Sequence, residues 1–244
     1  NRDLLVTCAR QRQLCISDST IVMPTDPNPT KADAVRDLGA RLVLSGTTFD
    51  DAREHATALA AEDRSRLVSA ANEPLLVAGV ATAYLELLAD APDLDVLVVP
   101  VGGGSGAAAA CLVAQALAPG LEVVAVQSAA SPAAHDSWRA RDLVARPNTS
   151  RAEGLATGTG FALTQAVLRE HLDDFVLVDD DTIDRAAALY LTAARTVAEG
   201  AGAAALAAVL ADPDRFAGRR VGVVCSGGNA SPAELRRVSA HLPR

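Results

Sequence analysis

Four glycines and one serine follow one another in the segment Gly102-Gly103-Gly104-Ser105-Gly106, directly after the apolar segment Asp93–Val101. Glycine permits positive φ angles and lets a backbone approach a ligand closely. Successive backbone N–H groups in such a loop form an anion-binding concavity, and the dipole of a following helix strengthens it. The segment therefore predicts a phosphate site. The alternative is a plain strand–helix turn, although such a turn needs only one or two glycines.

The same glycines also resemble the start of a dinucleotide fingerprint, G-x-G-x-x-G/A, with Ala107 in the third place. A dinucleotide-binding fold has an acidic residue at the end of the next strand, where it binds the ribose. Here the next apolar segment, Leu121–Gln127, is followed by Ser128. A phosphate site is therefore favoured, and a nucleotide-binding domain is the weaker alternative.

A second glycine turn, Ser226-Gly227-Gly228-Asn229, follows the apolar segment Arg220–Cys225. Parallel strands have their carboxyl ends at one edge of a sheet, so the two glycine turns can face one cavity. The neutral hydroxyl of Ser226 can bond a ring nitrogen, whereas a carboxylate in its place would keep that nitrogen protonated. The alternative is a structural turn in which Asn229 or Ser231 caps the last helix.

Alternating strands and helices would position both turns. Strands are expected over residues 19–23, 40–44, 66–69, 93–101, 121–127, 174–179 and 220–225. Helices are expected over residues 31–38, 49–62, 76–88, 107–117, 161–171, 181–196, 203–210 and after residue 231. Residues 128–160 read as a long irregular connection, and such connections are often functional. The order predicts an α/β fold with parallel-rich sheets in two lobes, a small βαβ lobe over residues 1–72 and a large cofactor-binding domain over residues 73–244.

Composition narrows the class of protein. The chain has 244 residues and a net charge of −8, which argues against nucleic acid as a partner. It has neither an uncharged apolar run of about 18 residues nor a signal peptide, so we expect a cytoplasmic protein without a membrane segment. The four cysteines are too scattered for a zinc site or a disulfide framework. The four histidines share no ligand spacing, so surface or helix-end positions and no metal site are expected.

Lys31 is the only lysine in the chain. It follows a proline-rich turn at the expected start of a helix, and we expect it to be a solvated surface residue. An enzyme that binds its cofactor through a lysine amine would therefore need a different lysine.

Five motifs in order resemble the threonine/serine dehydratases, which are fold type II pyridoxal-phosphate enzymes of the tryptophan synthase beta-like family. The match extends from about Thr20 to Asn229. Val99–Gly106 resembles the family's phosphate loop, and Ser226–Asn229 resembles its closing motif. The other similar segments are Ile21–Pro24 with Lys31 and Gly39-Ala40 in the small lobe, Glu153–Ala156 at the start of the second half of the large domain, and Glu199–Ala204 near the cofactor.

The resemblance implies a site for pyridoxal 5′-phosphate. In it, Gly102, Gly103, Gly104, Ser105 and Gly106 would bind the phosphate, Ser226 would meet the pyridine nitrogen and Glu199 would lie near the ring. It also implies an ammonia-lyase that converts a β-hydroxy amino acid such as L-threonine or L-serine to a 2-oxo acid and ammonia. The amino acid would be its small-molecule substrate, and a homo-oligomer such as a dimer is typical of the family.

Several departures from the family pattern matter for this expectation. Ser105 replaces a fourth consecutive glycine, and Gly106 replaces a larger residue. The family's Ser-Phe-Lys segment, which carries the Schiff-base lysine, does not occur before Thr20, and residues 1–15 resemble joined pieces of that region. No catalytic residue is therefore assigned within the chain. Either the protein is a lyase whose lysine lies in an N-terminal segment outside this sequence, or it is a lysine-less homologue that binds a phosphorylated ligand without catalysis.

Overall fold

The computed structural model describes residues 19–242. The expectations for residues 1–15 lie outside this range. Contacts within the chain divide it into two compact units, Asn1–Leu67 and Val68–Arg244. This division falls slightly before the lobe boundary expected at residue 72.

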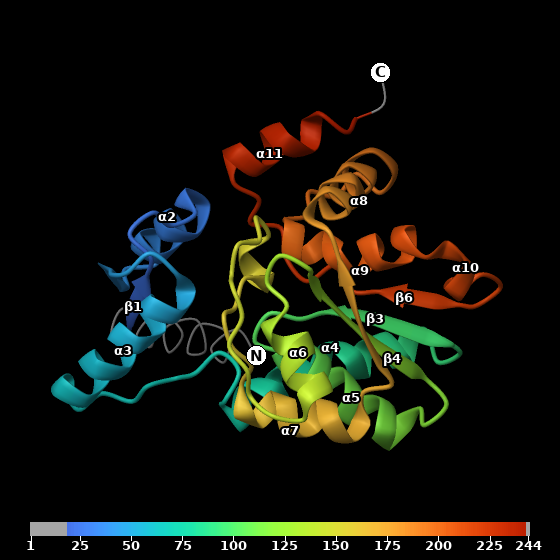
Figure 1. The fold of residues 1–244 in the computed structure, drawn as a ribbon, viewed down its shortest axis with the longest axis horizontal. Coiled ribbons are helices and arrows are strands. Elements are labelled where there is room, and N and C mark those ends of the chain that lie inside the picture. Colours follow the sequence, from blue (N-terminus) through green and yellow to red (C-terminus); the bar gives the residue numbers. More distant parts are fainter. Residues whose placement is uncertain (1–18, 243–244) are drawn as a thin grey trace, which may run out of the picture. The chain divides into compact units, whose positions relative to one another are not determined.

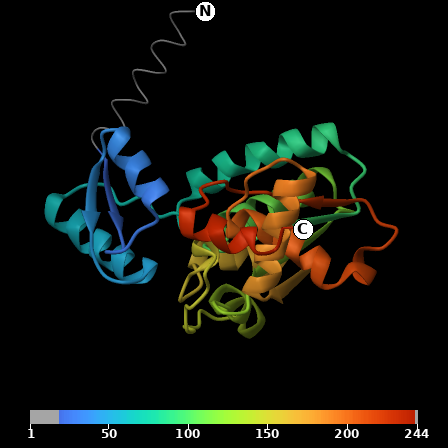
Figure 2. The same ribbon diagram turned by 90° about the horizontal axis from the view of Figure 1, so that it is seen from above.

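The first unit contains a pair of parallel strands, β1 (Thr20–Met23) and β2 (Arg41–Leu44). Helix α2 (Pro29–Asp37) contacts β2, and helix α3 (Phe49–Asp63) contacts β1. Figures 1 and 2 show both strands between these two helices. Capping sets the helix starts, because Asn28 accepts the Thr30 N–H at the start of α2.

The third strand expected in this unit, over residues 66–69, is wrong: these residues have no regular structure. Arg64 ends α3 in the left-handed conformation, and Leu67 and Val68 are exposed. A strand needs a neighbour to pair its backbone groups, and none is adjacent here among the described residues. Local β propensity therefore did not determine the structure of this segment.

The second unit is built on a parallel sheet in the order β5-β4-β3-β6. Its strands are β3 (Val96–Pro100), β4 (Glu122–Ser128), β5 (Asp174–Val178) and β6 (Val221–Val223). The central strands β3 and β4 are buried on both faces, as their unbroken apolar sequences predict. The predicted α/β class is confirmed.

Helices cover both faces of this sheet, as Figure 1 shows. Alternate residues of β3 point to opposite faces, so Leu97 and Val99 join one core and Val96 and Val98 the other. The first core also contains α4 (Pro74–Asp90), α5 (Ser105–Leu117) and α7 (Ala162–His171). The second contains α8 (Asp180–Ala193), α9 (Gly200–Ala211), α10 (Pro213–Phe216) and α11 (Pro232–Ser239).

The long connection over residues 128–160 is more ordered than the sequence suggests. It contains helix α6 (Ala133–Ala140) and the short 3-10 helix η1 (Glu153–Leu155). His135 lies at a helix end, in the first turn of α6, but it is buried and not on the surface, and it meets Phe175 edge to face at 5.4 Å between ring centroids. Among the described residues, no helix is long and apolar enough to cross a bilayer.

Helix α9 begins at Gly200, so the glycines of residues 200–202 lie inside the helix and do not interrupt it. The reason is close packing rather than flexibility. A Cβ at Gly202 would lie 2.3 Å from the Gly227 carbonyl oxygen, a distance that no side chain tolerates. The start of α9 therefore packs directly against the second glycine turn.

Candidate functional site

The two glycine turns meet at one cavity of about 660 Å³. Strands β3 and β6 are adjacent and parallel, so the turns that follow them open at the same sheet edge, as the sequence predicts. The cavity is lined by one face of α4, by the segment Gly102–Gly106, and by residues from Gly222 to Ser226. Gly102, Gly103, Gly104, Ser105, Gly106 and Ser226 are thus together, while Glu199 is not among the lining residues.

The glycine loop, Gly102–Gly106, presents unpaired donors. Gly104 has φ +90° and forms the N-cap of α5, a conformation that favours glycine. In the part of the chain that the structure describes, the N–H groups of Gly102 to Gly106 donate to no acceptor. These donors and the positive end of the α5 dipole create a site suited to an anion.

Two threonine hydroxyls hold the carbonyl groups of this loop. Thr164 Oγ1 donates to the Gly103 oxygen at 2.7 Å, and Thr157 Oγ1 lies 3.4 Å from the Gly102 oxygen. In a trans peptide the C=O and the following N–H point in opposite directions. Anchoring the two oxygens therefore directs the N–H groups of Gly103 and Gly104 away from the threonines.

Replacing Thr164 with valine tests this orientation. Thr164→Val keeps the side-chain shape but leaves the partly buried Gly103 oxygen without its donor. We expect a loss of ~1–3 kcal/mol in the free energy of unfolding and binding of a phosphorylated ligand that is about tenfold weaker. Denaturant unfolding and calorimetric titration measure the two effects, and Thr164→Ser is the matched control because it keeps the hydroxyl. Equal affinities of wild type and Thr164→Val would contradict the account.

Gln127 joins β4 to α6 and η1, a role that the sequence reasoning missed. It is completely buried. Its Oε1 accepts the N–H groups of Ala134 and His135 at 3.1 Å, and its Nε2 donates to the Leu155 oxygen at 3.3 Å. The Nε2 also lies 3.5 Å from Thr157 Oγ1. The side chain at the position of a ribose-binding acid thus faces the protein, which disfavours a dinucleotide site.

Helix η1 supports the glycine loop from the other side. The carbonyl oxygen of Gly154 lies 2.1 Å from the place that a Cβ on Gly102 would take. Leu155, buried in the second core, holds η1 in position. The backbone of the loop therefore has room only for glycine at residue 102.

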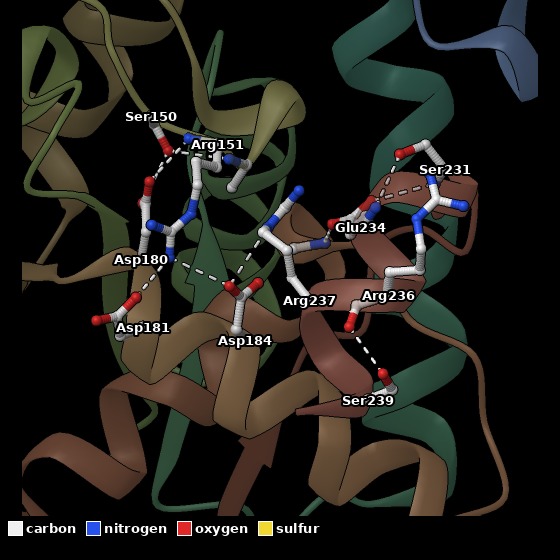
Figure 3. Close-up of polar contacts among 12 residues, drawn as sticks. Ser150, Arg151, Asp180, Asp181, Asp184, Ser231, Glu234, Arg236, Arg237 and Ser239 are labelled. Carbon is white, nitrogen blue, oxygen red and sulfur yellow. Dashed lines mark hydrogen bonds and ion pairs between the residues drawn. The ribbon is translucent and has the colours of Figure 1, made fainter. Parts of the chain in front are cut away.

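A cluster of charges fastens the segment before η1 to α8, as Figure 3 shows. Asp180 accepts the hydroxyls of Ser128 and Ser150 and the backbone N–H of Arg151. The buried Asp184 lies between two guanidinium groups, with Arg151 Nη2 at 3.1 Å and Arg237 Nε at 3.5 Å. These contacts hold both the segment before η1 and helix α11 against helix α8.

Ser226 is exposed on the cavity side of the second glycine turn. Glu199 lies behind this turn, at the N-cap of α9, and its N–H donates to the Gly227 oxygen at 3.0 Å. A Cβ at Gly227 would lie 2.2 Å from Glu199 Oε1, so the carboxylate rests directly on the turn. Cys225 also lines the cavity, and burial raises the pKa of its thiol.

Glu234 is a second buried carboxyl group in this region that the sequence reasoning missed. The Gly200 N–H donates to its Oε1 at 2.5 Å, and Glu234 also forms a capping box with Ser231. The sequence signal for it was the S-x-x-E pattern at residues 231–234. Burial raises the pKa of Glu234 above its ordinary value of 4.5, and the charge of Glu199 adds to this rise.

The raised pKa of Glu234 predicts a pH effect on stability. Because the folded protein binds this proton more tightly than the unfolded chain, the contribution is complete below pH 4.5 and is lost as the pH rises through the folded pKa. Glu234→Gln keeps an acceptor for the Gly200 N–H and does not titrate. The N–H groups of Gly200 and Ser231 and the charge of Arg237 lower the pKa of Glu234, but the net shift is upward. The variant should gain stability relative to wild type between pH 4 and pH 7, and unfolding curves at the two pH values measure this. If the stability difference between Glu234→Gln and wild type were the same at pH 4 and pH 7, this prediction would be contradicted.

Known proteins resemble this chain in sequence and in fold. Residues 8–227 match the family model described as pyridoxal-phosphate dependent enzyme. The chain belongs to this family. An L-threonine ammonia-lyase of Thermotoga maritima is 34% identical over 90% of the chain and 55% of its own length.

Solved structures of similar proteins have the same fold. Threonine deaminase isoform 2 of Solanum lycopersicum has a TM-score of 0.83 and 28% identity, covering 91% of this chain and 62% of its own. Serine racemase of maize has a TM-score of 0.81 and 26% identity, covering 91% of this chain and 69% of its own. The chain spans about half the length of the curated relatives it matches. The fold is that of fold type II pyridoxal-phosphate enzymes.

The donors of this site suit the family's cofactor. The glycine loop offers N–H groups without acceptors for a phosphate, and Ser226 offers a hydroxyl at the other turn of the same cavity. Within residues 19–242, no group of three or more histidine, cysteine, aspartate or glutamate side chains is arranged to hold a metal ion.

Proposed function

We propose that the glycine loop binds the phosphate of pyridoxal 5′-phosphate and that Ser226 meets the pyridine nitrogen. The observation that carries this proposal is the row of five N–H groups without acceptors at the start of α5. Neutral donors are sufficient there because the helix dipole and the backbone together favour a dianion. Residues Glu199 and Gly227 support the proposal less directly, since they hold Ser226 in place from behind.

The cofactor, when bound, supplies an electron sink that makes the α-proton of an amino acid acidic. The residues of this chain would orient it. The glycine loop would hold the phosphate end, and Ser226 would meet the ring nitrogen with a neutral hydroxyl that does not protonate it. The apolar strand residues and α4 exclude water from one side of the cavity.

For the whole protein we propose an ammonia-lyase reaction on a β-hydroxy amino acid such as L-threonine or L-serine. The products are a 2-oxo acid and ammonia, and the names of the relatives support this choice. A cytoplasmic location and a homo-oligomeric state are part of the same proposal. The alternative is a homologue that binds a phosphorylated ligand without catalysis, because the only lysine, Lys31, lies on α2 in the first unit.

Binding and activity are tested separately. In calorimetry, the chain should bind both pyridoxal phosphate and inorganic phosphate. It should bind pyridoxal, which lacks the phosphate, much more weakly. Binding of NAD but not of pyridoxal phosphate would overturn the proposal in favour of a nucleotide-binding domain.

For activity, the protein isolated from the cells that make it is assayed for 2-oxo acid formation from L-threonine and L-serine, and its intact mass is measured. Borohydride reduction with peptide mapping then identifies any lysine that carries the cofactor. Activity together with a labelled lysine supports the lyase. A mass near 25.0 kDa without activity supports the non-catalytic alternative.

A further inference from the structure

Helix α4 presents one polar side chain to the cavity, Tyr84. Its side chain lines the cavity, yet the residue is only 5% exposed. The atom nearest to the position of a Cβ on Gly106 is the Tyr84 hydroxyl oxygen, at 3.4 Å. The hydroxyl therefore lies beside the first turn of α5, where the glycine loop ends.

The Tyr84 hydroxyl forms no hydrogen bond within residues 19–242, and, unlike the Tyr190 hydroxyl, its oxygen is not among the fully buried atoms without a partner. Because the residue lines the cavity and its oxygen is open there, the hydroxyl can donate a hydrogen bond to a ligand bound in the cavity. The ring itself packs in the first core, together with Leu88 and Val99. A phenylalanine would fill the same space, which means that packing does not account for the hydroxyl.

Gly106 makes this arrangement possible. A larger side chain at residue 106 would extend from the Cβ position toward the Tyr84 hydroxyl and occupy its place. The departure from the family pattern at residue 106 therefore coincides with a phenol oxygen in the adjoining space. Burial also raises the pKa of Tyr84, so the hydroxyl keeps its proton and remains a donor at neutral pH.

We propose that the Tyr84 hydroxyl donates a hydrogen bond to a phosphate oxygen of the ligand that the glycine loop binds. It adds a side-chain donor to the backbone N–H groups at the start of α5. The inference rests on the proposed function, since it requires a phosphate at this loop. Tyr84 is then a residue that determines the preference for phosphorylated ligands, and its contribution is separable from the stability of the fold.

Tyr84→Phe removes the hydroxyl and keeps the ring. Calorimetric titrations of the purified chain with pyridoxal phosphate, inorganic phosphate and pyridoxal compare the variant with wild type. We expect the two phosphate-bearing probes to bind about tenfold more weakly, because one hydrogen bond to a charged group is lost. The affinity for pyridoxal should not change. The melting temperature of the ligand-free variant should equal or exceed that of wild type, since no internal hydrogen bond is lost.

Tyr190→Phe is the matched control. Tyr190, the only other tyrosine, packs against the second core, on the opposite face of the sheet, and its buried hydroxyl has no partner among the described residues. This variant should bind all three probes like wild type.

The outcomes separate the two proposals. Equal phosphate affinity in Tyr84→Phe and wild type would overturn the role of Tyr84 alone, as would a lower melting temperature of the ligand-free variant with unchanged affinity. Failure of the wild-type chain to bind either phosphate-bearing probe would overturn the proposed cofactor site, and the role of Tyr84 with it.

Discussion

Gly102→Ala is expected to reduce pyridoxal phosphate binding at least ~tenfold and to destabilise the fold by ~1–3 kcal/mol. The new Cβ would lie 2.1 Å from the Gly154 carbonyl oxygen, and a backbone atom cannot move aside as a flexible side chain can. Either the glycine loop or η1 must shift. A shift of the loop displaces the N–H groups that the ligand needs, so both affinity and stability fall.

Gly79→Ala is the matched control for this prediction. It makes the same chemical change within α4, where a Cβ would meet nothing within 4 Å. Alanine is the better helix former by ~1 kcal/mol, so this variant should be as stable as wild type or more stable. Calorimetry and denaturant unfolding measure both variants. A Gly102→Ala protein with the affinity and stability of wild type would show that the loop is not held against η1.

Gln127→Leu is expected to cause the largest loss of stability, ~3 kcal/mol or more, because each buried backbone group left unsatisfied costs ~1–3 kcal/mol. Leucine fills the volume but leaves the N–H groups of Ala134 and His135 and the Leu155 oxygen without their partner. Ligand affinity should also fall, because Gln127 contacts Thr157, whose hydroxyl anchors the Gly102 oxygen.

The matched control for Gln127→Leu is Gln115→Leu. Gln115 is exposed on α5, so the same substitution there should change the free energy of unfolding by less than ~0.5 kcal/mol. Urea unfolding compares the two variants. Equal effects would mean that the buried amide of Gln127 does not hold α6 and η1.

The parts of this fold that the sequence predicts are those with a local signal. The apolar runs around Val98 and Val124 are long and bounded by glycine or polar residues, which identifies buried parallel strands. Each of the two glycine turns directly follows such a strand. Their meeting at one cavity then follows from the parallel direction of β3 and β6.

The features that the sequence did not reveal depend on contacts between distant residues. Helix α6 has no capping side chain of its own, and its first N–H groups are satisfied by Gln127 from β4. Thr164 lies 61 residues from the Gly103 oxygen that it anchors. Tyr84 lies in the helix expected over residues 76–88, and only its distance from Gly106 shows where its hydroxyl lies. Neither composition nor periodicity contains such information.

The most direct test of the phosphate site is a ¹H–¹⁵N NMR titration of the chain, first with inorganic phosphate and then with pyridoxal phosphate. Both ligands should shift the amide signals of the glycine loop most strongly, because those N–H groups would gain an acceptor. Only pyridoxal phosphate should also shift the signals of Ser226 and Gly227. Saturable shifts in another part of the chain, with the signals of Gly102–Gly106 unchanged, would contradict the account.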